Sequence, residues 1–173
     1  MNTAMLLLRN NKRVADSILN VLAADDHTRG SLFTRLEKIK RLDKFPTKYS
    51  TQPDLARSYL LADRNYAIID SIAFISKQPA QYNKKKGTVY FFKYRLKKDE
   101  GWKIGISGLQ PENINEVSSN NKLVRLTEKK IKDDEPLDDQ LDKQLKRLLF
   151  SLSKTGKNFY LGENLGRFRK DDY

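Results

Sequence analysis

The feature that most constrains the fold is a pair of strand-like segments, residues 88–96 (TVYFFKYRL) and 102–107 (WKIGIS), separated by Asp99-Glu100-Gly101. β-Branched and aromatic residues favour extended strands, and an acidic residue followed by glycine favours the tight turn of a hairpin. Before them, residues 68–75 are rich in isoleucine and predict a strand that ends or bends at Pro79. Together these patterns predict an antiparallel meander of three strands, to which residues 123–126 add either an edge strand or a helical turn.

Residues 1–64 have the apolar spacing of short helices instead. Apolar residues recur three and four positions apart, which places them on one helix face. Residues 25–28 (DDHT) supply side chains that cap a second helix. The pair Phe45-Pro46 ends that helix, because the residue before a proline avoids the α region. The apolar face predicted for one of these helices carries Val14, Ile18 and Leu22, with Ala15 and Leu19 alongside.

A longer helix follows the strands. Residues 133–136 (DDEP) predict its start, because acidic side chains favour the positive end of the helix dipole and proline fits the first turn. Gly156 is placed to end it, and the tail, residues 159–173, has enough apolar side chains to dock loosely. The leucines that share its apolar face are Leu137, Leu141, Leu145, Leu148, Leu149 and Leu152.

The fold class predicted from these patterns is α+β. We expect a helical segment over residues 1–64, built of helix pairs or forming the end of a longer helical region. We expect an α+β domain over residues 65–173, with a meander of three to four strands. In this arrangement the long C-terminal helix packs on the aromatic face of the sheet.

The two faces of the predicted hairpin differ in chemistry. Side chains alternate across a strand, so one face is expected to be core and the other to be open. The expected core face carries Tyr90, Phe92, Tyr94 and Leu96, with Trp102, Ile104 and Ile106 on the return strand. The expected open face carries Val89, Phe91, Lys93 and Arg95, with Lys103 and Ser107 on the return strand.

Basic residues concentrate on this hairpin. The chain has 34 Lys and Arg against 22 Asp and Glu, a formal net charge of +12, and eight basic residues but two acidic ones lie between positions 84 and 103. A basic sheet face that carries an aromatic ring can bind phosphates and stack a base. The simpler interpretation, a solvated sheet face whose lysines oppose aggregation, is favoured. The candidate polyanion-binding residues are Lys84, Lys85, Lys86, Phe91, Lys93, Arg95 and Lys103.

The composition excludes several kinds of catalytic and metal site. The chain has no cysteine, which excludes disulfide scaffolds, thiolate zinc sites and cysteine nucleophiles. Its one histidine, His27, follows two aspartates, where helix capping is favoured over metal binding. The glycines of residues 105–108 and of residues 155–157 match no complete phosphate-binding loop. We therefore predict no catalytic residues, no metal and no cofactor.

Three functional hypotheses remain from the sequence. No run of 18 apolar residues is present, so no membrane span is predicted, and no signal peptide is visible; the compartment stays open. The leading hypothesis is a non-catalytic interaction module, the C-terminal part of a larger protein, whose partner is the remainder of that chain or another protein. The alternatives are a binder of RNA or another polyanion, and an enzyme with a cleft between sheet and helices, where burial would activate a side chain.

Overall fold

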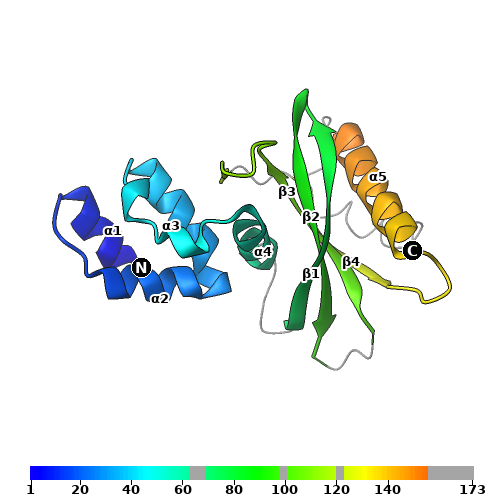
Figure 1. Ribbon diagram of the computed structural model, residues 1–173, viewed down its shortest axis with the longest axis horizontal. Coiled ribbons are helices and arrows are strands. Elements are labelled where there is room, and N and C mark those ends of the chain that lie inside the picture. The colour runs from blue at the N-terminus through cyan, green and yellow to red at the C-terminus, as the bar shows by residue number, and fades with distance from the viewer. Residues whose placement is uncertain (63–68, 98–100, 120–122, 156–173) are drawn as a thin grey trace.

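The computed structural model describes residues 1–62, 69–97, 101–119 and 123–155, and these form an α+β fold (Figure 1). Within them are five α-helices and a sheet with strand order β1-β2-β3-β4, in which each strand is antiparallel to the next. The predicted class and the predicted meander are therefore confirmed, and residues 123–126 belong to a fourth strand. The helices are α1 (Asn2–Arg9), α2 (Asp16–Ala24), α3 (Asp26–Lys38), α4 (Gln52–Ala62) and α5 (Leu137–Thr155). The strands are β1 (Ile69–Tyr82), β2 (Lys85–Leu96), β3 (Lys103–Gln110) and β4 (Leu123–Lys130), and 3-10 turns cover Leu42–Lys44 and Thr47–Tyr49.

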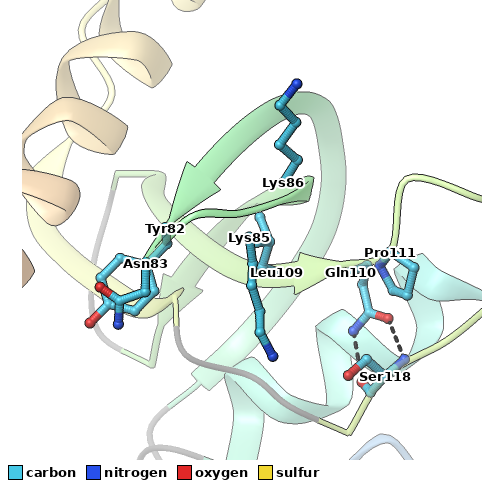
Figure 2. Close-up of a pocket in the computed structure, with 8 residues that line it drawn as sticks. All are labelled: Tyr82, Asn83, Lys85, Lys86, Leu109, Gln110, Pro111 and Ser118. Carbon is cyan, nitrogen blue, oxygen red and sulfur yellow. Dashed lines mark hydrogen bonds between the residues drawn. The ribbon is translucent and has the colours of Figure 1, made fainter.

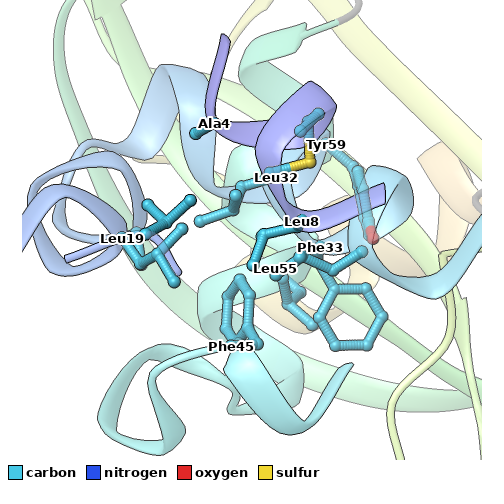
Figure 3. Packing of buried hydrophobic residues seen from close by; sticks show 12 residues of the cluster. Ala4, Leu8, Leu19, Leu32, Phe33, Phe45, Leu55 and Tyr59 are labelled. Atoms are coloured by element: carbon cyan, nitrogen blue, oxygen red, sulfur yellow. The ribbon is translucent and has the colours of Figure 1, made fainter. Parts of the chain in front are cut away.

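The helices α1 to α4 enclose a core of their own (Figure 3). The predicted cap of the second helix is confirmed, because the Asp25 carboxylate accepts a hydrogen bond of 3.0 Å from the backbone N–H of His27. The predicted end at Phe45-Pro46 is wrong: α3 ends at Lys38, and Lys40 takes a φ of 57° before the 3-10 turns begin. The chain therefore bends back earlier, and the Phe45 ring packs edge-on against Phe33 with 5.2 Å between ring centroids.

The strand β1 is longer than predicted. Of the two predicted alternatives at Pro79, an end or a bend, the end is wrong, because β1 runs to Tyr82 and Pro79 pairs with Thr88 of β2. Proline is tolerated there because β1 is an edge strand of the sheet. A two-residue turn then joins β1 to β2, with Asn83 and Lys84 both at positive φ, 49° and 63°, as the right-handed twist of a hairpin requires. The predicted turn at residues 99–100, the helix end at Gly156 and the tail lie outside the described residues.

Both faces of the sheet are covered by helices, and the assignment of helices to faces differs from the prediction. Figure 1 shows α4 on one side of the sheet and α5 on the other. The leucines of α5 pack against Phe91 and Ile106, whereas Ala56 and Leu60 of α4 pack against Tyr90 and Phe92. The expectation that α5 covers the face of Tyr90 and Phe92 is therefore wrong.

The error comes from the register of the return strand. Ile106 lies opposite Phe91 and Ile104 lies opposite Lys93, so these side chains share a face. The alternation of apolar residues predicts both isoleucines on the face of Tyr90, and a shift of one residue moves every side chain of a strand to the other face. Gly105 instead lies on the α4 side, where an added Cβ would come within 2.6 Å of Leu60 Cδ2. The missing side chain lets α4 approach the sheet.

Two buried glutamines fix the loop after β3. Gln52, at the start of α4, donates from Nε2 toward the carbonyls of Pro111, Asn113 and Glu116 at 2.6–2.9 Å. Gln110 donates to the carbonyl of Ser118 and accepts from its N–H, at 3.0 and 2.9 Å. Because both glutamines are almost fully buried, residues 111–118 are held against the sheet and α4. None of the helices described here has the length and apolar character needed to cross a bilayer.

Candidate functional surfaces

The structure does not bring the candidate polyanion-binding residues onto one face. Phe91 has no exposed surface and lies under α5, so its ring is not available to stack on a base. Lys103 lies opposite Tyr94, on the face away from Lys93 and Arg95. The predicted basic and aromatic platform is therefore divided, because the register of β3 places its lysine on the opposite side from the one expected.

Lys93 and Arg95 belong to a cluster around Trp102. The Lys93 ammonium lies 4.8 Å and the Arg95 guanidinium 5.4 Å from the centroid of the indole ring, which is the geometry of cation–π contacts. Arg95 also forms an ion pair with Asp70, with 2.7 Å between Nη2 and Oδ2. The hydrogen bond from Arg95 holds the pKa of the Asp70 carboxyl below its ordinary value. These contacts give the two cations a role in joining β1, β2 and the start of β3.

The three consecutive lysines lie at the tip of the β1–β2 hairpin and are exposed. Residues 71–98 contain eight basic residues and no acidic one. The one carboxylate of β1 and β2, Asp70, lies at the other end of the hairpin and pairs with Arg95. Beside the tip is a pocket of about 370 Å³ between the hairpin and the segment that follows β3 (Figure 2). Its lining residues are Tyr82, Asn83, Lys85, Lys86, Leu109, Gln110, Pro111 and Ser118.

One wall of this pocket forms where the backbone at the end of β3 passes close to the backbone of β2. At Gly87 an added Cβ would lie 2.2 Å from the carbonyl oxygen of Gln110 and 2.7 Å from Leu109 Cγ. Only a glycine therefore lets the end of β3 cross so near β2. The far wall, Pro111 and Ser118, is held by the buried glutamines described above. Figure 2 shows the Lys85 side chain extending on the side of Ser118, whereas Lys86 extends to the opposite side.

A third surface consists of aliphatic side chains on the N-terminal helices. In α2, Ile18 is 50% and Val21 is 70% exposed, although Leu19 and Ala23 are buried. The predicted burial of Ile18 is therefore wrong. Since α2 (DSILNVLAA) is apolar on most of its circumference, its periodicity alone does not identify the inner face. On α1, Leu6 and Leu7 are also exposed, while Leu8 is buried.

Two of these features, the exposed face of α2 and the pocket, were not predicted from the sequence. The exposed pair Ile18 and Val21 could have been noticed because α2 has more apolar residues than one buried face needs. The pocket had no comparable signal, since Leu109, Pro111 and Ser118 reach it only through the fold. Within the described residues no group of three or more potential metal-binding side chains comes together. No protein-family model matches the chain, and neither a curated protein nor a solved structure shows a significant match to it.

Proposed function

We propose that this protein is a non-catalytic interaction module that binds a protein partner through the exposed aliphatic face of α2. The observation that carries the proposal is the exposure of Ile18 and Val21, three positions apart on one side of that helix. Residues at this spacing are neighbours on a helix surface, so the two side chains form one stripe.

The composition of α2 supports this function. Of its nine residues only Asp16, Ser17 and Asn20 are polar, and a helix that is apolar on most sides is normally buried on most sides. Leu19 and Ala23 bury one side in the core of the N-terminal helices. The opposite side has no cover among the described residues, and a partner surface would supply it.

The energetics of burial favour an apolar partner. Removing a valine or isoleucine side chain from water stabilises a complex by about 1.5–3 kcal/mol. The stripe has no aromatic or cationic member, which is the opposite of what a surface for nucleic acid needs. The predicted polyanion platform is meanwhile divided between two sheet faces, with Phe91 buried. A protein surface of complementary aliphatic side chains is therefore the favoured partner.

Site-specific photo-crosslinking tests the proposal. A benzophenone amino acid is placed at Val21, and the matched control is the same group at Phe150, which is 55% exposed on α5 at the other side of the sheet. In cells that make the protein naturally, the Val21 position should give a discrete adduct that the Phe150 position lacks. The cross-linked protein is then produced in purified form, and its binding to the wild-type chain is measured directly.

Two results would contradict the proposal. One is a Val21 adduct pattern identical to that of Phe150 while both variants keep the wild-type circular dichroism spectrum. The other is a purified cross-linked protein that binds wild type and an Ile18→Ser/Val21→Ser variant equally well. A self-adduct that is confirmed by a concentration-dependent dimer would support it and identify the partner as a second copy.

A further inference from the structure

The pocket beside the β1–β2 hairpin is independent of the proposed protein-binding face, because none of its lining residues belongs to α1, α2 or α3. We propose that it binds a small organic anion, a phosphate monoester attached to a flat apolar body. The Lys85 ammonium would hold the phosphate, and Tyr82, Leu109 and Pro111 would contact the apolar part.

The negative charge proposed for the ligand follows from the positive charges around the pocket. The charged side chains that line it, Lys85 and Lys86, are both cationic, and Lys84 adds a third positive charge at the adjoining turn. The hairpin from residue 71 to residue 98 has no carboxylate to compete for these ammonium groups. A lysine ammonium binds phosphate as a compact point charge, and such charge-assisted hydrogen bonds are stronger than neutral ones.

The two lysines are not equivalent. Adjacent residues of a strand point to opposite faces, and Figure 2 shows the Lys85 and Lys86 side chains extending in opposite directions. Lys85 pairs across the turn with Tyr82, so its stem and the phenol ring share one side of the hairpin. Lys85 is therefore the cation that reaches a ligand beside Tyr82, while Lys86 contributes to the general positive potential.

The apolar part of the ligand is inferred from the remaining walls. Leu109 and Pro111 contribute aliphatic surface, and Tyr82 contributes a ring face. The volume of about 370 Å³ falls in the range of small-molecule sites, which are usually apolar clefts with a few placed polar groups. Inorganic phosphate alone would leave these apolar walls wet, so an organic ester fits the pocket better.

The pocket is formed before a ligand arrives. The Gln110–Ser118 pair of hydrogen bonds and the Gln52 contacts to Pro111 fix one wall. Ordering of a loop on binding would subtract from the affinity, and a preformed wall avoids that cost. The hairpin tip supplies the other wall through a two-residue turn, the shortest common hairpin connection.

Phenyl phosphate is the probe for this site, and two-dimensional amide NMR is the measurement. Phenyl phosphate should shift the amide signals of Tyr82, Lys85 and Leu109 in a saturable way. Inorganic phosphate and benzyl alcohol should each bind at least about tenfold more weakly, because each lacks one of the two contacts. Benzoate distinguishes a phosphate site from a general anion site: affinity equal to that of phenyl phosphate overturns the phosphate assignment.

Variants separate the pocket from the general basic charge of the hairpin. Lys85→Ala should weaken phenyl phosphate binding by at least about tenfold, and Lys85→Arg should restore most of it. Lys77→Ala is the matched control, since it removes the same charge from an exposed β1 position that lies opposite Tyr90, on the other sheet face. Equal losses in Lys85→Ala and Lys77→Ala would overturn the proposal, because they would show nonspecific attraction. Binding of a single-stranded oligonucleotide without any binding of phenyl phosphate would overturn it too.

Discussion

Gln52 joins three parts of the molecule, and its replacement gives the sharpest test of the architecture. The side chain is 2% exposed, and its Oε1 accepts a hydrogen bond of 2.6 Å from the Tyr90 hydroxyl in the middle of the sheet. Its Nε2 points at the carbonyls of Pro111, Asn113 and Glu116. One side chain of α4 thus fixes both β2 and the loop that forms a wall of the pocket.

The change Gln52→Met keeps the size of the side chain and removes these hydrogen bonds. A buried polar group left without a partner costs about 1–3 kcal/mol, and each hydrogen bond that is lost contributes about 1 kcal/mol. The Tyr90 hydroxyl and the partly buried carbonyls lose their partner together. We expect the free energy of unfolding to fall by roughly 2–4 kcal/mol, measured by urea-induced unfolding followed by circular dichroism.

A double-mutant cycle makes this test specific. Tyr90→Phe removes the hydroxyl that Gln52→Met leaves unpaired, so the double variant should lose about 1 kcal/mol less than the two single changes added together. Hydrogen exchange should show faster exchange of the amides of residues 111–118 in Gln52→Met. A loss of less than about 0.5 kcal/mol, or strict additivity with unchanged loop exchange, refutes the role given to Gln52.

Three further predictions follow from other contacts. Gly87→Ala should lower the free energy of unfolding by about 1–3 kcal/mol in urea unfolding, because its Cβ would meet the Gln110 carbonyl at 2.2 Å; wild-type stability would contradict the close approach. Burial raises the pKa of the Tyr59 hydroxyl from 10.0 to about 12, so above pH 10 the unfolded chain loses this proton first and stability falls as the pH rises. Between pH 10 and pH 11, the free energy of unfolding of wild type should fall by about 1 kcal/mol more than that of Tyr59→Phe, measured by urea unfolding. An equal fall in the two proteins would show that burial does not raise the pKa of this hydroxyl. Since the hydrogen bond from Arg95 lowers the pKa of Asp70, Arg95→Gln should raise that pKa in a carboxyl-carbon NMR titration, and an unchanged midpoint would exclude the ion pair in solution.

Most of the secondary structure could be predicted from the sequence, whereas the helix that covers each face of the sheet could not. Strand-forming side chains over residues 88–96 and the DDEP start of α5 are local signals, and both elements form where expected. The face of each strand depends on register, which one chain segment does not encode alone. In β2 the consecutive residues Val89, Tyr90 and Phe91 are all buried, so alternation does not distinguish a covered face from an open one.

The candidate sites were harder to predict from the sequence for a related reason. The basic residues of the hairpin were visible by counting, but their grouping required knowing that Lys103 lies opposite Tyr94. The pocket forms where the end of β3 and Ser118 lie beside the tip of the β1–β2 hairpin, and these segments are distant from one another in the chain. The uncovered side of α2 follows from an excess of apolar residues over the available core, a quantity that depends on the packing of the other helices.

Whether the Ile18 and Val21 side of α2 binds a protein partner is decided by calorimetric titration of this chain with the partner protein that the Val21 crosslink captures. Ile18 is 50% and Val21 is 70% exposed before binding, so their burial contributes about 2–4 kcal/mol. Ile18→Ser/Val21→Ser should therefore weaken binding by at least about tenfold. Phe150→Ser, which removes an equally exposed apolar side chain from α5, should leave the affinity at the wild-type value. Equal affinities for wild type, the Ile18→Ser/Val21→Ser variant and Phe150→Ser would show that this side of α2 does not bind the partner.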